Sequence, residues 1–145
     1  MLNRAIKIAT EAHAGQLDKV GQPYINHPLR VMNMGATVEE KIVGVLHDVV
    51  EDSDWTLEQL VAEGFSAEII EALRCVTKLS DDEPYDEFIK RIAVNPLAVK
   101  VKLNDLTDNM DIRRLTDISD NDVKRLRKYL KAYRYYIGIG FNSPI

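Results

Sequence analysis

The residues best suited to chemistry form a short His-Asp-x-x-Glu-Asp stretch, made by His47, Asp48, Glu51 and Asp52. We predict a helix through this stretch, which places Glu51 one turn after His47 and Asp52 one turn after Asp48. All four polar groups then lie on one side of a helix whose other sides are apolar. Burying four ionisable groups is unfavourable unless a metal ion or partner charges compensate them. A solvated helix end with one hydrogen-bonded histidine is an equally good interpretation of this stretch alone.

Further polar groups elsewhere in the chain could join this set. His27 lies where a loop enters a helix, and Asp105 lies inside an otherwise apolar helical run. The ordinary alternative for His27 is a local hydrogen bond. For Asp105 the alternative is a surface stripe that it shares with Lys102 and Asn109. The third histidine, His13, is expected to hold the loop that follows the first helix.

Together these groups offer two imidazoles and two carboxylates from three helices, which is a ligand set for a divalent transition metal. The chain has one cysteine, Cys75, which excludes a multi-cysteine zinc site and an internal disulfide framework. We expect Cys75 to be a buried core thiol. Mn²⁺, Fe²⁺ or Zn²⁺ is then favoured, with Glu51 and Asp52 left beside the ion to move protons from water. That combination is typical of a metal-assisted hydrolase.

The elements that must position these groups are predicted to be helices, because apolar residues recur at steps of three and four. Capping boxes at Thr37 and Thr56, and prolines at first helical positions, mark several helix starts. We predict an all-α fold, a single compact bundle of seven to eight helices over residues 1–145. The expected helices lie at about 2–15, 28–35, 37–52, 56–64, 66–76, 84–92, 95–109 and 120–137, the last ended by Gly138, Gly140 and Pro144.

Length and composition agree with one globular domain. The chain has 145 residues, of which 46% are hydrophobic and 29% charged, so a packed core is expected. The net charge of -4 disfavours a general nucleic-acid binder. No apolar stretch approaches the roughly 20 residues needed to span a bilayer, and the first residues lack the apolar run of a signal peptide. We therefore expect no nucleic-acid or membrane partner and a cytoplasmic location, while the oligomeric state stays open.

The predicted last helix is rich in basic residues. Six of them lie between Lys124 and Arg134, interleaved with Tyr129 and Tyr133. This pattern fits a helix that attracts phosphate or a partner. It fits the exposed face of an amphipathic terminal helix even better.

Four segments of the chain resemble the HD-domain alarmone hydrolases, which are the hydrolase domains of RelA/SpoT-type proteins and their small stand-alone relatives. These segments are AHAGQ at 12–16, GQPYINHP at 21–28, LHDVVED at 46–52 and VKLND at 101–105. The resemblance covers about residues 5–115. A His-Asp pair alone is shared by the wider HD superfamily, whereas His-Asp-x-x-Glu-Asp with an upstream Tyr-Ile-x-His-Pro is specific to this branch. The 145 residues leave no room for the family's synthetase domain, so we expect the activity of this chain to be hydrolytic only.

The resemblance implies a role for each candidate residue. It assigns four ligands to one Mn²⁺ ion, namely His27, His47, Asp48 and Asp105. It assigns activation of the attacking water to Glu51 and Asp52. The nucleotide contacts would be Lys19, Asn109 and Lys102. The implied reaction releases pyrophosphate from the ribose 3′ position of guanosine tetraphosphate or pentaphosphate.

The chain departs from this family in the expected substrate pocket. Relatives with alarmone activity usually carry Arg before the residue that matches Lys19, where this chain has Asp18, and Asp111 is a second departure. Arg and Asp differ in charge and in stacking ability. Two alternatives therefore stay open, an HD phosphohydrolase for a different nucleotide and a non-catalytic nucleotide-binding regulatory module. The presence of both Glu51 and Asp52 argues against the second.

Overall fold

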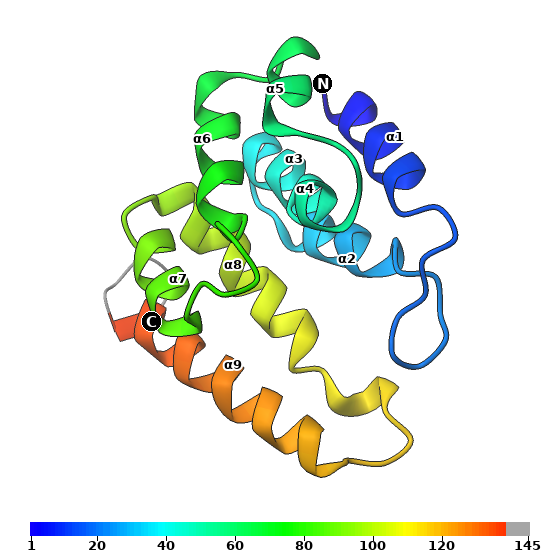
Figure 1. Cartoon of the computed structure of the whole chain (residues 1–145), viewed down its shortest axis with the longest axis vertical. Coiled ribbons are helices and arrows are strands. Elements are labelled where there is room, and N and C mark those ends of the chain that lie inside the picture. Colours follow the sequence, from blue (N-terminus) through cyan, green and yellow to red (C-terminus); the bar gives the residue numbers. More distant parts are fainter. Residues whose placement is uncertain (139–145) are drawn as a thin grey trace.

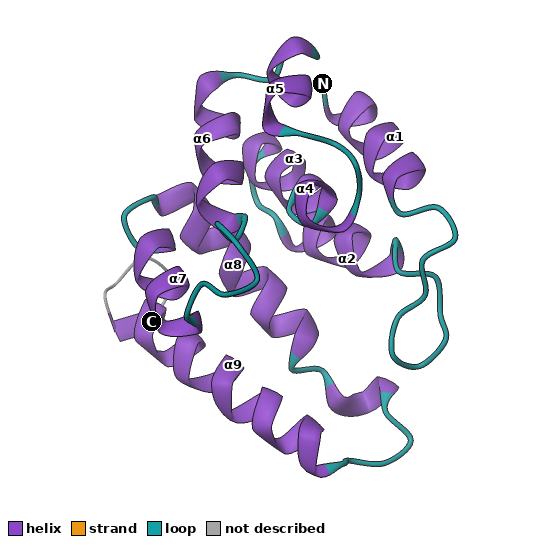
Figure 2. Ribbon diagram, viewed as in Figure 1, coloured by secondary structure: helices purple, strands orange, loops and turns teal. Residues whose placement is uncertain are grey.

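The structure is a computed structural model that describes residues 1–138 of the chain. The described part contains nine α-helices, one 3₁₀ turn and no strand. Figure 2 shows the helices and the loops that connect them. The α-helices are α1 (Leu2–Ala12), α2 (Asn26–Met34), α3 (Val38–Leu46), α4 (Val49–Asp52), α5 (Leu57–Ala62), α6 (Ala67–Val76), α7 (Tyr85–Ile92), α8 (Pro96–Asn109) and α9 (Asp120–Gly138), and the 3₁₀ turn is η1 (Ile112–Arg114). The predicted all-α fold is confirmed. The predicted helix breakers Gly140 and Pro144 lie outside the described residues.

Helix α3 lies at the centre of the bundle and packs against α1, α2, α6 and α8 (Figure 1). Nearly all of its apolar side chains are buried, as its sequence predicts. Gly44 allows α2 to approach closely, because a Cβ at this position would lie 3.3 Å from the main chain of Met32. Cys75 of α6 is buried in the same core, as predicted.

The predicted helix over 37–52 is interrupted at His47 and Asp48, which adds one helix to the eight expected. The His47 imidazole donates from Nδ1 to the carbonyl oxygen of Gly44 at 2.6 Å. In an uninterrupted α-helix that oxygen would accept from the main-chain N–H of Asp48. The side chain thus competes with the helical hydrogen bond. His47 and Asp48 consequently lie at the junction between α3 and α4 and not inside one helix.

Side-chain caps define several helix starts. The capping box predicted at Thr56 is present, with Thr56 accepting from the main-chain N–H of Gln59 and the Gln59 side chain accepting in return. At the start of α3, Thr37 accepts from the N–H of Glu40. The Glu40 carboxylate binds the Thr37 hydroxyl and the N–H of Ala36, one residue earlier than a capping box requires. Each cap satisfies main-chain donors that would otherwise lack partners.

Helix α9 crosses the end of the bundle and contacts α8 (Figure 1). Two of its residues, Ala132 and Tyr136, are buried, and the Tyr136 hydroxyl donates to the carbonyl oxygen of Ile89 in α7 at 2.9 Å. Most of its basic side chains are exposed, as an amphipathic terminal helix predicts. No helix in residues 1–138 combines the length and hydrophobicity that crossing a membrane requires.

The loop between α1 and α2 is held from both sides. His13 donates from Nδ1 to the Gln16 side chain at 2.8 Å, and Gln16 donates to the main-chain oxygen of Asp52 at 2.7 Å. An isolated β-bridge between Leu17 and Pro23 closes the loop. These contacts agree with the structural role predicted for His13, and they tie the loop to α4.

Candidate metal centre

The four predicted ligands come from separate parts of the chain and meet between α2, α3 and α8. His27 lies in the first turn of α2, His47 and Asp48 lie at the α3–α4 junction, and Asp105 lies in the second half of α8. His27, His47 and Asp105 are buried, and Asp48 is partly buried. The structure therefore brings together all four side chains that the sequence analysis named as ligands.

The candidate ligand atoms are close enough to surround one ion. His27 Nε2 lies 2.9 Å from an Asp105 oxygen and 3.7 Å from an Asp48 oxygen, and His47 Nε2 lies 3.1 Å and 3.3 Å from oxygens of Asp48 and Asp105. One atom each from His27, His47 and Asp48 lies within 4.8 Å of the other two. Ligands about 2.1 Å from a common ion are roughly 3–4 Å apart, so these separations suit a single divalent metal.

His47 supplies an independent test of whether the site fits a cation. Its Nε2 atom is buried and makes no hydrogen bond within residues 1–138, although carboxylate oxygens lie nearby. Because Nδ1 donates to Gly44, the neutral imidazole presents a lone pair at Nε2 toward the cluster. A buried acceptor that faces carboxylates is unfavourable unless a proton or a metal ion binds to it. The residues present thus fit a divalent metal ion.

Asp108 orients the other histidine, and the sequence analysis missed this residue. His27 Nδ1 donates to the Asp108 carboxylate at 2.6 Å, which directs His27 Nε2 into the cluster. Asp108 also accepts from Arg30 at 2.7 Å and from Arg114 at 3.3 Å, and it is 3% exposed. A carboxylate behind a ligating histidine fixes its tautomer and raises its basicity. The available signal was an aspartate one turn after Asp105 on the same helix.

Tyr24 is a second residue to which the sequence analysis assigned no role. Its hydroxyl donates to Asp48 Oδ2 at 2.6 Å. Burial and the Asp48 charge raise its pKa far above the ordinary value, so the hydroxyl stays protonated and remains a donor. Tyr24 therefore fixes the orientation of a candidate ligand, and it forms part of the YINHP segment that carries the family resemblance.

Neighbouring opposite charges dominate the protonation of the four candidate ligands. Burial alone would lower the pKa of His27 and His47, but the adjacent carboxylates raise both. Burial alone would raise the pKa of Asp48 and Asp105, but adjacent cationic groups lower both. The carboxylates are therefore ionised at neutral pH. A divalent cation would displace protons from the imidazoles when it binds.

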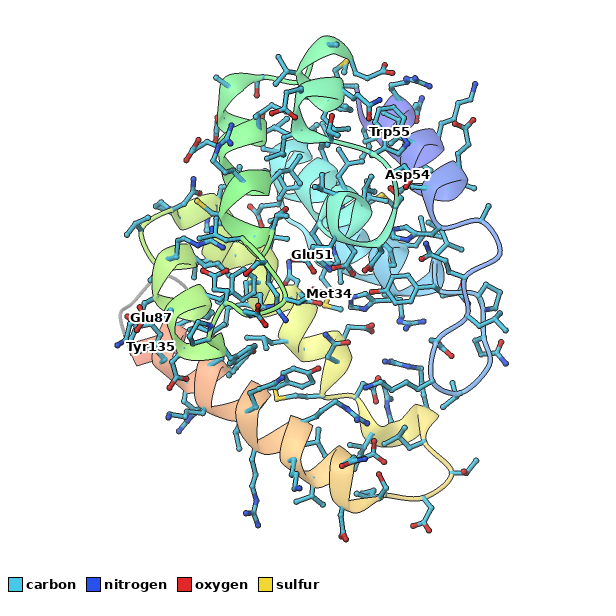
Figure 3. All side chains as sticks on the ribbon, viewed as in Figure 1. Met34, Glu51, Asp54, Trp55, Glu87 and Tyr135 are labelled. Atoms are coloured by element: carbon cyan, nitrogen blue, oxygen red, sulfur yellow. The ribbon has the colours of Figure 1, made fainter. Side chains whose placement is uncertain are left out.

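Glu51 and Asp52 both project from α4 beside this cluster, with Glu51 near the middle of Figure 3. Glu51 lines the same cavity as His47 and Asp105, and one of its oxygens accepts from the N–H of Lys78 at 2.6 Å. Burial raises the pKa of Glu51. Burial and the charges of Asp48 and Glu51 raise the pKa of Asp52 to about 6. Asp52 is therefore suited to proton exchange near neutral pH, and the pKa of Glu51 is shifted in the same direction.

The predicted substrate contacts lie around the cluster in different roles. Lys19 is exposed and lines a cavity beside the cluster. Asn109 lines that cavity and donates to Asp105 at 3.0 Å. Lys102 forms an ion pair with Asp105 at 2.8 Å, so it balances the charge of a candidate ligand.

Two cavities flank the cluster and share Tyr24, His27, Asn109 and Tyr129 in their walls. The larger has a volume of about 330 Å³ and lies between the α1–α2 loop, η1 and α9. The smaller cavity has a volume of about 170 Å³, and its lining includes the four candidate ligands and Glu51. Asp52 does not line it. The larger cavity is bordered by four cationic side chains, which are Lys19, Arg30, Arg114 and Arg125.

The two acidic departures from the family are engaged by local partners. One Asp18 oxygen accepts from the main-chain N–H groups of Val20 and Gln22, which closes the α1–α2 loop. Asp111 pairs with Arg113 at 2.9 Å, and this hydrogen bond lowers its pKa. Both carboxylates border the larger cavity, but each is already held by donors.

A protein-family model described as "HD domain" matches residues 5–135. The chain belongs to the HD domain family. The fold agrees with this assignment, since a solved structure described as a metazoan ortholog of SpoT that hydrolyzes ppGpp matches with a TM-score of 0.80. That match covers 98% of this chain and 87% of the other chain at 24% identity, and it supports the fold alone.

Curated relatives match the HD domain over a small part of their length. The guanosine-3′,5′-bis(diphosphate) 3′-pyrophosphohydrolase of Aquifex aeolicus is 34% identical over 75% of this chain and 17% of its own. The bifunctional (p)ppGpp synthase/hydrolase SpoT of Escherichia coli is 31% identical over 91% of this chain and 20% of its own. A probable GTP pyrophosphokinase of Mycobacterium leprae is 34% identical over 79% of this chain and 16% of its own length. The chain thus spans at most about a fifth of the length of these relatives.

Proposed function

We propose that this HD domain is a Mn²⁺-dependent phosphohydrolase that removes the 3′-diphosphate from (p)ppGpp-like nucleotides. The observation that carries the proposal is the convergence of His27, His47, Asp48 and Asp105 beside Glu51, between two cavities. The relatives described as 3′-pyrophosphohydrolases support the substrate class.

The ion would be held by the two imidazole Nε2 atoms and the two aspartates, with no thiolate among them. Oxygen and imidazole ligands suit Mn²⁺, Fe²⁺ and Zn²⁺, and we choose Mn²⁺ on the family resemblance. When bound, the ion supplies a water of lowered pKa and a positive charge for a phosphoryl oxygen. Tyr24 and Asp108 hold Asp48 and His27 in place for this task.

The proposed reaction is hydrolysis of the bond between the ribose O3′ and the adjacent phosphorus. A water oxygen bonds to that phosphorus, the P–O3′ bond breaks, and O3′ takes a proton, so a 3′-hydroxyl and pyrophosphate are formed. Glu51 is placed to accept the proton of the water, because it borders the cavity that contains the ligands. Asp52 has a pKa of about 6 and can exchange that proton with Glu51 or with solvent.

The larger cavity is the proposed site of the nucleoside. Its volume of about 330 Å³ lies within the range of roughly 300–1,000 Å³ that is typical of small-molecule sites. Lys19 and Asn109 are the contacts expected from the sequence, and Arg30, Arg114 and Arg125 are further cations that the sequence analysis did not name. A cavity bordered by cations suits a nucleotide with several phosphates.

The test is to measure metal content and to identify the products released from a nucleotide panel in Mn²⁺. We expect one metal per chain, and pyrophosphate from guanosine nucleotides with a 3′-diphosphate. Release of no pyrophosphate from any 3′-diphosphate would contradict the proposal. Release of a different phosphate product from another nucleotide would support the alternative HD phosphohydrolase, which Asp18 keeps open. Binding without turnover would support a regulatory module. The cytoplasmic location stays a prediction.

A further inference from the structure

The smaller cavity is lined by acidic and by basic groups. It contains the candidate metal ligands and Glu51. It also contains three lysines, one from the loop after α6, one from α8 and one from α9, which are Lys78, Lys102 and Lys128. The volume of about 170 Å³ is below that of typical small-molecule sites, which are roughly 300 Å³ or more. A space of this size suits a compact anion better than a nucleoside.

Two of the three lysines lack an acidic partner. Lys102 pairs with Asp105, whereas Lys78 and Lys128 have no carboxylate within 4.0 Å among residues 1–138. Burial and the nearby charges of Lys78, Lys102 and Arg125 lower the pKa of Lys128. Like charges that line one cavity repel one another, and an anion bound there would offset the repulsion.

Tyr85, at the start of α7, adds a neutral donor to the lining of the smaller cavity. Its hydroxyl is buried and has no hydrogen-bond partner in the described part of the chain. Burial raises its pKa to about 12, so the hydroxyl keeps its proton at neutral pH. Lys128 lies over the ring face, with Nζ 4.5 Å from the centroid. A buried donor without an acceptor is unfavourable, and a phosphate oxygen in the cavity would satisfy it.

We propose that Lys78, Tyr85 and Lys128 form a subsite for the terminal phosphate of a 3′-diphosphate. This inference rests on the proposed function, because the phosphorus attacked must lie at the metal centre. The nucleoside lies on one side of that phosphorus, in the larger cavity, so the second phosphate extends to the other side. There it meets two unpaired cations and an unpaired hydroxyl. The subsite thus selects a diphosphoryl over a monophosphoryl group at the ribose 3′ position.

The experiment compares Lys128→Gln and Tyr85→Phe with a control, Lys124→Gln. Lys124 is exposed one turn earlier on α9 and borders neither cavity. Binding of inorganic pyrophosphate to the Mn²⁺-loaded protein is measured by calorimetry. Steady-state kinetics are measured with guanosine nucleotides that carry a 3′-diphosphate or a 3′-monophosphate.

We expect Lys128→Gln to weaken pyrophosphate binding about tenfold, because a charge-assisted hydrogen bond contributes roughly 1.5 kcal/mol or more. Tyr85→Phe should weaken it about threefold to tenfold, and the control should not change it. The KM for the 3′-diphosphate should rise by similar factors, while inhibition by the 3′-monophosphate nucleotide should stay within about twofold.

Pyrophosphate affinities within twofold of wild type in both variants would overturn the subsite, even if the wild type hydrolyses 3′-diphosphates. Equal losses for the monophosphate and the diphosphate would also overturn it, because the residues would then act on the phosphate at the metal. Pyrophosphate binding that depends on Lys128 in a protein without 3′-pyrophosphohydrolase activity would support the subsite. In that case only the proposed reaction would fail.

Discussion

Replacing Asp108 by Asn tests whether the metal centre depends on the carboxylate behind His27. The substitution keeps the shape of the side chain and removes its charge. It weakens the hydrogen bonds that Asp108 accepts from His27 at 2.6 Å and from Arg30 at 2.7 Å. Because Asp108 is 3% exposed, water cannot replace these bonds easily.

The expected loss of stability follows from the pKa of Asp108. Burial raises this pKa, but the hydrogen bonds from His27 and Arg30 outweigh burial and lower it from 3.8 to about 2. A shift of this size corresponds to about 2 kcal/mol of unfolding free energy at neutral pH. Since the folded-state pKa is depressed, this contribution is present above pH 3.8 and is lost as the pH falls toward 2. The difference between wild type and Asp108→Asn should therefore narrow below about pH 4.

The metal affinity should change as well, because Asp108 fixes the tautomer of His27. Loss of a carboxylate behind a ligating histidine typically lowers metal affinity by about 10–100-fold. Denaturant unfolding of the metal-free protein measures the stability, and competition with a chelator measures the Mn²⁺ affinity. Asp111→Asn is the matched control, because Asp111 also lies near Arg114 but makes no hydrogen bond to His27.

An Mn²⁺ affinity within twofold of wild type in Asp108→Asn would refute the assigned role of Asp108. A similar loss in Asp111→Asn would show that the effect comes from the electrostatic field around Arg114. A stability difference that stays constant below pH 4 would show that another group sets the pH dependence.

Three further substitutions test the chemistry, the substrate pocket and the fold. Glu51→Gln should keep the bound metal and lower turnover by about 10²–10⁴-fold, whereas Asp105→Ala should lower the metal occupancy itself. Metal analysis and steady-state kinetics measure both effects. Full activity in Glu51→Gln would identify another residue as the base. Asp18→Asn keeps the oxygen that closes the loop but removes a negative charge beside the larger cavity. The KM for a 3′-diphosphate nucleotide should therefore fall about twofold to fivefold, with kcat nearly unchanged. An unchanged KM would show that this loop does not affect binding. Tyr136→Phe should cost about 1 kcal/mol in denaturant unfolding, because it removes the buried hydrogen bond from α9 to α7, and exposed Tyr135→Phe should have no effect; equal effects would contradict the anchoring role of Tyr136.

The sequence predicted most of the helices because helix formation depends on local features. Apolar spacing, capping residues such as Thr56, and prolines at first turns act within a few residues of each helix. The break between His47 and Asp48 could not be predicted by these rules. It involves a side chain that binds the Gly44 carbonyl, and apolar spacing continues across the break.

The sequence also determined which residue types are present for chemistry. Few histidines and an isolated Asp105 in an apolar run limited the choice of ligands, and their burial near one another agrees with that choice. The roles predicted for Glu51 and Asp52 followed from their spacing beside the candidate ligands and from the family resemblance. The sequence did not predict that, of these two carboxylates, Glu51 lines the smaller cavity and Asp52 does not.

The partners of the ligands were decided by the tertiary structure alone. Asp108 is 81 residues from His27, and Tyr24 is 24 residues from Asp48. Such pairs form only because α2, α3 and α8 pack against one another and carry the adjoining α1–α2 loop and α3–α4 junction with them. The packing of α2 on α3 depends on the close approach at Gly44. Tertiary packing also brings Lys78 and Lys128, which have no acidic partner among residues 1–138, into the lining of the smaller cavity. It likewise places the Asp18 loop beside the larger cavity. Local sequence rules act over one or two turns of helix, so they determine the helices and the available ligands but not the contacts that connect them.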